Sequence, residues 1–352
     1  METAGATNDH IVPVMYLKRF AVPRSGGHQI SAALVDCPDN DFLTNVRNVG
    51  SEKGFYWGVD PEGIPHHQME ELLTLIERAA TPAFRYLLDR GQRLSDNALA
   101  EPWPTRPDVR TAISWWLAAQ ILRTAPQRDR LWRLDAQRLE PPRGFVRANP
   151  HLAFIIEAIA PLAGLISRKP WGMGFTDLCL FTSDVPVQLI NARADDDPIR
   201  AAAYWDIYSP LDAHRFLYLR GKVHKSQREV QVDHLINLPG GLAIPLNQLM
   251  VENAHRHLLW HPEHDPRPRC QMQDALRMRS SRSPTGGSET LISYDTIPAG
   301  FGVERRWLDQ HTWDLGSPQP DLQPLTNEEA IDVASAMSRR THEDRIEFER
   351  GI

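Results

Sequence analysis

The sequence predicts an α+β protein, rich in helix, with a mixed or antiparallel sheet contributed mainly by the second half of the chain. Apolar residues recur at helical spacing through long stretches of the first half. Beyond residue 175 the apolar runs become short and are bounded by turn residues, as strands are. The length of 352 residues and the apolar fraction of 41% are ordinary for a globular chain with a sizeable core.

Four helices are expected in the first half of the chain, at residues 13–20, 66–90, 108–124 and 150–167. Pro13 suits the first turn of its helix, where a missing N–H costs nothing, and this places His10 just ahead of that helix. Pro82 should break or kink the second helix. Gln120 and Arg123 lie on or beside the apolar stripe of the third, so each needs a partner for its polar atoms.

Strands are expected at residues 29–35, 175–190, 202–211, 214–220 and 289–297, with further helices at 245–260 and 326–350. Two stretches rich in proline, 95–107 and 262–288, have the composition of linkers. Residues 1–9 are polar, and we expect them to form a flexible N-terminus.

Composition and charge limit the classes of protein. Three separated cysteines and the lack of a secretory signal favour a cytoplasmic protein, and the most apolar stretch, 152–166, is too short to cross a membrane. The net charge of −6 argues against indiscriminate coating of nucleic acid. Arginines nevertheless gather in segments 123–147, 215–228 and 267–282, which are either a solvated surface or sites for phosphate groups.

The common nucleotide-binding, serine-hydrolase and metal motifs are absent from the sequence, so no cofactor and no metal are expected. The histidine-rich segment HRHLLWHPEH contains His257 and His261 at metal-ligand spacing, but Pro262 ends any helix there, and a cluster at a helix end or on the surface is favoured. Ser183 and Asp184 stand at a strand end, where they form either part of a site or a turn. Glu77 lies on a long helix, where most glutamates are simply solvated.

Four segments, HIVPVMYLKRF, SEKGFYW, AAQILRTAPQR and FTSDVPV, occur in this order, and together they resemble the family catalogued as domain of unknown function 4238. The resemblance covers about residues 10–260, which makes this range the core domain and residues 261–352 a C-terminal extension with a terminal helix. The chain departs from the usual pattern of the family at one position, because Ala125 stands between the Arg-Thr pair and Pro126. The matching positions are His10, Pro13, Tyr16, Leu17, Phe20, Glu52, Lys53, Phe55, Tyr56, Gln120, Arg123, Thr124, Arg128, Thr182, Ser183, Asp184 and Pro186.

The family is in turn similar to the arginine-containing cyclodipeptide synthases of fungi, and this resemblance implies an acyl transferase that joins aminoacyl groups delivered by charged tRNA. An aminoacyl ester is already activated, so the enzyme needs a base, an acid that holds the substrate side chain, and a basic surface for tRNA. The residues expected to be catalytic are His10, Asp184 and Glu77. Those expected to bind substrate are Arg123, Gln120, Lys53, Tyr56 and Ser183.

Two other classes of function remain open from the sequence. One is a phosphodiesterase or nuclease-like hydrolase, acting in defence or as a toxin, that uses His10 with Asp184 and Glu77, with or without a divalent metal. The other is a binding module in which the same polar residues only hold the fold together. For a transferase or a hydrolase, we expect His10, Arg123 and Asp184 to meet in one pocket.

Overall fold

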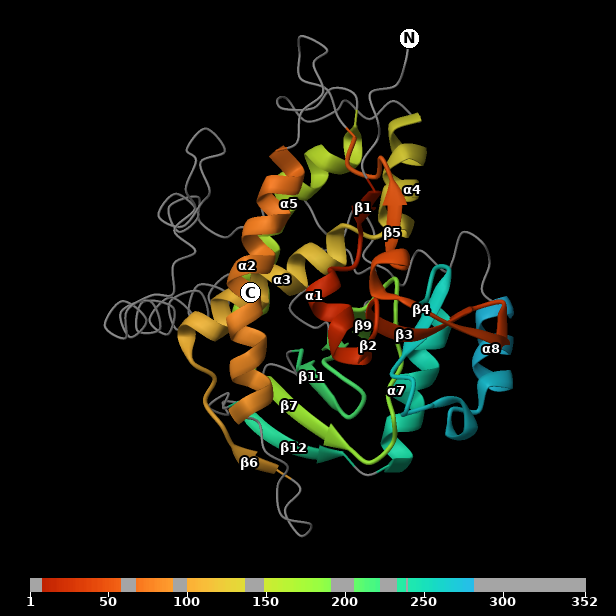
Figure 1. Ribbon diagram of the computed structural model, residues 1–352. Coiled ribbons are helices and arrows are strands. Elements are labelled where there is room, and N and C mark those ends of the chain that lie inside the picture. The colour runs from red at the N-terminus through yellow and green to blue at the C-terminus, as the bar shows by residue number, and fades with distance from the viewer. Residues whose placement is uncertain are drawn as a thin grey trace.

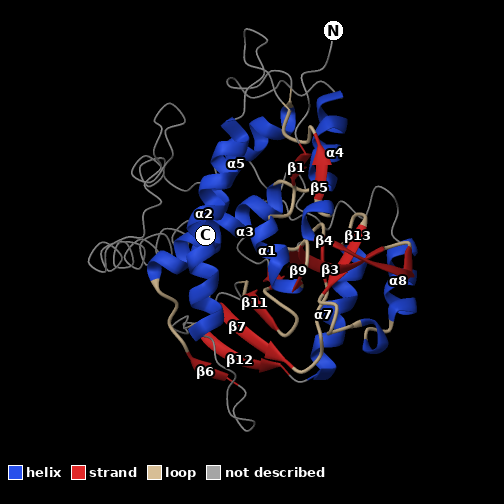
Figure 2. Cartoon of the chain, viewed as in Figure 1, coloured by secondary structure: helices blue, strands red, loops and turns tan. Residues whose placement is uncertain are grey.

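The computed structural model describes residues 8–57, 68–90, 100–136, 149–190, 206–221, 233–238 and 240–281. Helices and sheets are both prominent, as Figures 1 and 2 show, and the α+β class is confirmed. In Figure 1 the long helices gather on one side of the molecule, above a mixed sheet, and the C-terminal part of the described chain lies on the other side.

Three long helices form the helical layer: α2 (Gln68–Arg90), α3 (Pro107–Leu122) and α5 (Pro150–Ser167). Helix α3 packs against both of the others. It is therefore buried on all sides and not along a single stripe, since Trp115, Ala118 and Ala119 are as inaccessible as Trp116. Helix α2 continues through Pro82, so the expected break is absent. A fourth helix, α4 (Ala125–Ala136), follows α3 after a short turn.

The larger sheet has the strand order β6–β12–β7–β11–β10–β9. Its strands are β6 (Ala100–Pro102), β7 (Trp171–Thr176), β9 (Gln188–Ile190), β10 (Asp206–Pro210), β11 (Arg215–Leu219) and β12 (His234–Leu238). Only β12 and β7 are parallel, which makes the sheet mixed as expected. Gly174 faces Phe216 across the β7–β11 pair, where a Cβ atom would overlap the phenyl ring.

The second sheet is built around β3 (Gly27–Leu34), which pairs with β2 (Val22–Arg24), β4 (Cys37–Asn45) and β13 (His257–Trp260). Strand β8 (Thr182–Ser183) adds to the free edge of β13. A separate two-stranded ladder joins β1 (Asn8–His10) to β5 (Ser51–Lys53), and the short helix α1 (Val14–Leu17) follows β1. The first 53 residues thus supply more strands than the sequence patterns indicate.

Several expected boundaries are wrong. The helix expected at 245–260 is α7 (Gly240–Asn253), which begins earlier, tolerates Pro245 and ends where the chain turns into strand β13. Part of the linker expected at 262–288 folds as α8 (Met272–Ser281). Asn8 and Asp9, expected in a flexible terminus, are paired in β1. The strand expected at 289–297 and the helix expected at 326–350 lie outside the described residues.

Apolar side chains from α2, α3 and α5 and from the larger sheet form one continuous core, and a smaller cluster gathers around α7, β13 and α8. Burial of this kind is the main favourable contribution to folding. No helix in the described part of the chain is both long and apolar enough to cross a membrane.

Candidate functional site: a buried arginine beside a neutral histidine

Arg123 is the centre of the site. It follows the last residue of α3, its own N–H donates to the carbonyl oxygen of Ala119 at 2.9 Å, and its side chain is only 1% exposed. A guanidinium cannot lose its charge in a protein, so burial at this level requires acceptors for its N–H groups. The expectation that Arg123 needs a buried partner is confirmed.

Two helices and the second sequence motif supply those acceptors. Arg123 Nη1 donates to Glu77 Oε1 on α2 at 3.0 Å. With the amide oxygen of Gln120 turned toward the guanidinium, this oxygen accepts from Arg123 Nε at 2.8 Å and also from Nη2. The phenol of Tyr56 is also near the guanidinium, since burial raises the pKa of Tyr56 and the charge of Arg123 opposes this rise. Gln120, Arg123 and Tyr56, all expected to bind substrate, therefore lie together with Glu77.

His10 reaches the same place from the end of strand β1. Its carbonyl oxygen accepts from the hydroxyl of Tyr56 at 3.3 Å, and the neighbouring Asp9 carboxylate accepts from the Tyr56 N–H at 2.9 Å. The ring of His10 is half-buried, and its Nδ1 has no hydrogen-bond partner among the described residues. Strand β1 and the residues after β5 thus hold the imidazole beside the arginine–glutamate pair.

The electrostatic surroundings favour neutral His10. Burial lowers the pKa of His10 below its ordinary value; the charge of Glu77 opposes this effect, and the charge of Arg123 reinforces it. The structure does not support the N-terminus of helix α1 as a cause of this lowered pKa. Helix α1 has four residues and no side-chain cap, and the N–H groups of Ile11 and Val12 donate to Gly50. The alternative in which His10 caps this helix has no hydrogen bond to support it.

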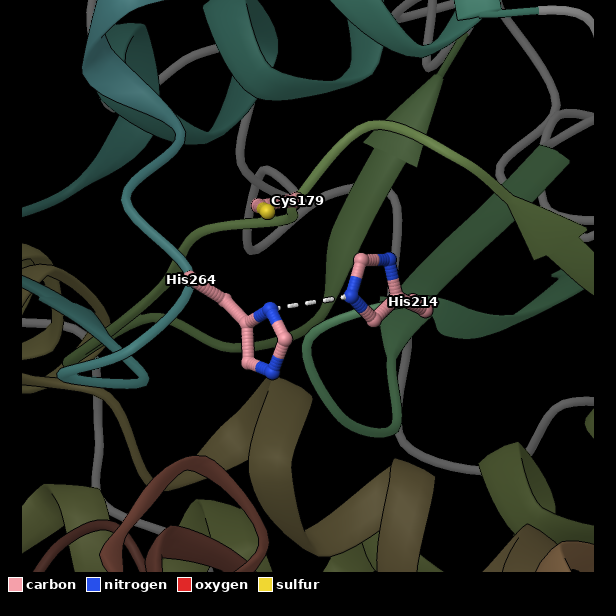
Figure 3. A group of neighbouring side chains, drawn as sticks. All are labelled: Cys179, His214 and His264. Carbon is pink, nitrogen blue, oxygen red and sulfur yellow. Dashed lines mark hydrogen bonds between the residues drawn. The ribbon is translucent and has the colours of Figure 1, made fainter.

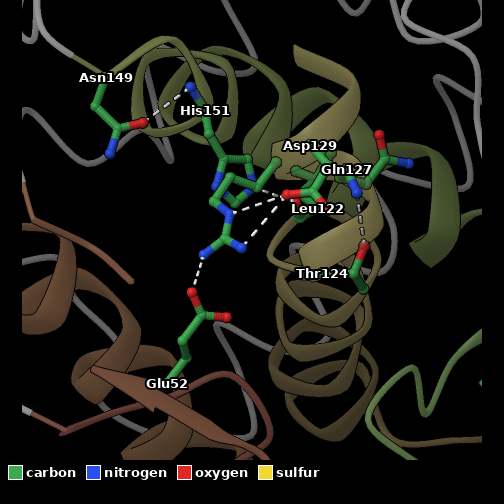
Figure 4. Close-up of polar contacts among 8 residues, drawn as sticks. Glu52, Leu122, Thr124, Gln127, Asp129, Asn149 and His151 are labelled. Carbon is green, nitrogen blue, oxygen red and sulfur yellow. Dashed lines mark hydrogen bonds and ion pairs between the residues drawn. The ribbon is translucent and has the colours of Figure 1, made fainter. Parts of the chain in front are cut away.

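A second arginine, Arg128, connects the third sequence motif to the second. Arg128 on α4 donates to Glu52 of β5 at 2.5 Å, and its guanidinium lies 4.5 Å from the centre of the Phe55 ring. Figure 4 shows Glu52 rising from the strand toward the start of α4, where the Thr124 hydroxyl accepts from the N–H of Gln127. These contacts fix the turn between α3 and α4, and with it the position of Arg123.

Helix α5 closes the same junction. The Asn149 side chain accepts from the N–H of His151 and so caps the helix, as Figure 4 shows. The His151 ring is hydrogen-bonded through Nε2 to the carbonyl oxygen of Leu122 at 2.9 Å, which occupies one of the exposed acceptors at the end of α3.

Asp184 and Ser183 belong to a different network. The Asp184 carboxylate accepts from three consecutive backbone N–H groups, those of His255, Arg256 and His257, at 2.7–3.1 Å. The Ser183 hydroxyl is buried and donates to the carbonyl oxygen of Val185. The partner of Arg123 is Glu77 and not Asp184, so the structure gives no support to a common pocket for His10, Arg123 and Asp184.

The remaining expected residues are placed as follows. Lys53 is exposed on β5, opposite Asn8 of β1. Tyr16 of the first motif is fully buried, and its hydroxyl joins Thr182 of the fourth motif at 2.8 Å while donating to the carbonyl oxygen of Pro210. The first and fourth motifs therefore meet through a structural contact.

Much of the described arginine surplus is engaged within the protein. Arg267 pairs with Asp41 and Asp265, and Arg277 pairs with Asp274. Arg215 pairs with Asp212. All of 137–147 and all of 222–228 lie outside the described residues. Because these arginines already pair with acids of the protein, the described part of segment 267–282 is less suited to bind phosphate groups than its number of arginines indicates.

These contacts determine what the site can do chemically. A neutral imidazole with an open nitrogen can accept a proton, and a carboxylate that shares one oxygen with a buried guanidinium can bind a cation through the other. Glu77 Oε2 has no hydrogen-bond partner within the described residues, and the side chain is 29% exposed. Within the described cluster, His10 thus has a buried nitrogen without a partner, and Glu77 has a partly exposed carboxylate.

Comparison with known proteins gives one match. Residues 8–141 fit the sequence model of the family described as "Protein of unknown function (DUF4238)", a range that holds the first three motifs and every residue of the Arg123 cluster. Neither the curated proteins nor the solved structures yield a match to the chain. Over residues 8–141, somewhat more than a third of its length, the chain is thus similar to the DUF4238 family.

Proposed function

We propose that the chain is an acyl transferase that accepts aminoacyl groups from charged tRNA and joins two of them into a cyclic dipeptide. The observation that carries the proposal is His10, whose Nδ1 is buried without a hydrogen-bond partner and whose lowered pKa favours the neutral ring, beside the ion pair of the buried Arg123 with Glu77. The resemblance to the cyclodipeptide synthases supplies the reaction, and the cluster supplies a base and a binding group that such a reaction requires.

The proposed steps need only proton transfer in addition to binding. The α-amine of one aminoacyl group attacks the ester carbonyl of the other, and a new amide bond forms as the tRNA hydroxyl leaves. His10 takes the proton from the attacking amine and returns it to the departing oxygen. The free amine of the resulting dipeptidyl ester then attacks its own ester carbonyl, which closes the ring and releases the second tRNA. General base assistance of this kind contributes about 10²–10⁴-fold.

Glu77 takes the role that the sequence assigned to an acid such as Asp184. Its Oε1 is fixed by Arg123 and its side chain is 29% exposed, so the carboxylate can receive a guanidinium or ammonium group of the substrate. An arginyl group suits this acceptor because its fork of N–H groups matches a carboxylate.

An RNA-binding face is proposed around the junction of β5 and α4. Trp57, which follows β5, is 55% exposed, and Trp132, one helical turn after Arg128, is 42% exposed. Lys53 is exposed on the same strand. Exposed aromatic rings near cations suit single-stranded RNA, since stacking of a base contributes about 1–3 kcal/mol.

The test is mass spectrometry of extracts from bacterial cells that express the chain, followed by reaction of the purified protein with arginyl-tRNA and a second charged tRNA. Wild type should form a cyclic dipeptide, and His10→Asn and Glu77→Gln should lose it. Glu71→Gln is the matched control, because Glu71 is exposed on the same helix. Absence of any cyclic dipeptide in the wild-type reaction refutes the proposal, and cleavage of the RNA instead would favour the hydrolase.

A further inference from the structure

A second group of side chains meets far from Arg123 in the chain. Cys179, His214 and His264 each offer one donor atom, and the three atoms lie within 4.8 Å of one another. In Figure 3 the two imidazole rings face each other, with Cys179 beside them. The three residues come from three loops: the one between β7 and β8, the turn between β10 and β11, and the segment after β13.

The loops are held in place independently of these side chains. Two backbone hydrogen bonds, Thr176 N–H to His214 O and Leu180 N–H to Ala213 O, join the first loop to the turn on either side of Cys179. The third loop has its own anchor, since Arg267 lies 4.6 Å from the centre of the Trp260 ring and pairs with Asp41. The three donor atoms are therefore brought together by a scaffold that exists without a ligand.

The orientation of His214 suits a metal ligand. Its Nδ1 is 3.2 Å from the carbonyl oxygen of Thr176, which can only accept, so Nδ1 carries the proton and donates. The neutral ring then presents a lone pair at Nε2, which lies 3.2 Å from His264 Nδ1. A histidine ligand whose other nitrogen donates to a backbone carbonyl is the usual outer-shell arrangement of protein metal sites.

From these observations we infer that Cys179, His214 and His264 bind one Zn²⁺ ion, with water as the fourth ligand. One thiolate and two imidazoles are a ligand set that zinc accepts. With bonds of about 2.0–2.1 Å, two nitrogens of a tetrahedral zinc site are about 3.4 Å apart, close to the 3.2 Å found here. The Cys179 sulfur, which lies within 4.8 Å of both donor nitrogens, would have to move closer to them for all three to bond one ion. The ion would displace the imidazole–imidazole hydrogen bond and link the three loops.

The sequence indicated no such site, because its ligands are distributed over three loops and share no spacing motif. His257 and His261, the pair considered there, do not belong to the group, although the His261 ring lies 4.8 Å from the His264 ring. Among the described residues no other histidine, cysteine or acidic side chain joins the group of three.

The inference is tested by titrating the purified, metal-free full chain with Co²⁺ and with Zn²⁺. Cobalt should bind at one ion per chain and show ligand-field bands together with a thiolate charge-transfer band, both of which Zn²⁺ should abolish by displacement. Cys179→Ser should lose the charge-transfer band, and His264→Gln should weaken binding by more than the roughly 10–100-fold that outer-shell changes cause.

Cys37→Ser and His255→Gln are the matched controls, because both residues are exposed and lie outside the group. Both should keep the spectrum and the stoichiometry of the wild type. Wild-type protein that gives no thiolate band with Co²⁺, or a band that Cys37→Ser removes and Cys179→Ser keeps, overturns the assignment. The wild-type titration alone decides the matter if a ligand variant fails to fold.

Discussion

Replacement of Arg123 by alanine tests the centre of the site. The variant leaves the amide oxygen of Gln120 buried without its donor, which costs about 1–3 kcal/mol. It also deprives Glu77 of its partner. Loss of one member of a buried pair costs about 3–5 kcal/mol, but the 29% exposure of Glu77 lets water replace part of the interaction. We therefore expect a decrease of about 3–4 kcal/mol in the free energy of unfolding.

The measurement is urea denaturation, with the transition midpoint compared at equal m value. Arg85→Ala is the control, since Arg85 is exposed on α2 and its loss should cost about 0–1 kcal/mol. In the double variant Arg123→Ala/Glu77→Gln the loss should be smaller than the sum of the two single losses, because the two side chains contact each other. Equal midpoints for Arg123→Ala and Arg85→Ala would refute the description of a buried, paired guanidinium.

Three further predictions concern residues of the motifs. Asp184→Ala should destabilise the protein, since three backbone N–H groups lose their acceptor. The folded variant should still form cyclic dipeptide at a rate near that of wild type, and a rate lower by about 10²-fold or more would return Asp184 to the residues proposed to be catalytic. Tyr16→Phe should lower the free energy of unfolding by about 1–3 kcal/mol, measured by urea denaturation, because the buried Pro210 carbonyl loses its shorter hydrogen bond and the buried Thr182 hydroxyl loses its partner. Because the pKa of His10 is lowered on folding, stability should fall as pH drops below the unfolded value of about 6.5 toward the lower folded value, and His10→Asn should flatten this part of the stability profile.

Periodicity predicted the long helices because each of them has a face that must be buried. It located α2 and α5 to within two residues, apart from the start of α2, where residues 58–67 lie outside the description. It failed at residues 257–260, since a short apolar run fits a helix and a strand equally well. Strand β13 is decided by its pairing with β3, more than 200 residues earlier in the chain, which no local pattern contains.

The candidate site was predictable in part for the same reason. A polar residue on a buried helix face needs a partner, so the burial of Gln120 and Arg123 could be read from the sequence. Which acid would pair with Arg123 could not, because Glu70, Glu71 and Glu77 are the same residue type on one helix, and only the packing of α2 on α3 selects Glu77.

The fate of each polar atom separates residues that position the fold from residues that can act on a ligand. In the fourth motif the polar groups are occupied within the protein: Thr182 by Tyr16, Ser183 by Val185, and the Asp184 carboxylate by the turn that leads into β13. A group used in this way gains nothing by binding a substrate, because its existing hydrogen bonds would first have to be broken. His10 Nδ1 and Glu77 Oε2 are different, since neither has a hydrogen-bond partner among the described residues, while the His10 backbone and Glu77 Oε1 are held by Tyr56 and Arg123. On this criterion the cluster around Arg123 is the better candidate for the proposed catalysis, and the fourth motif serves to hold the two sheets to the N-terminal segment.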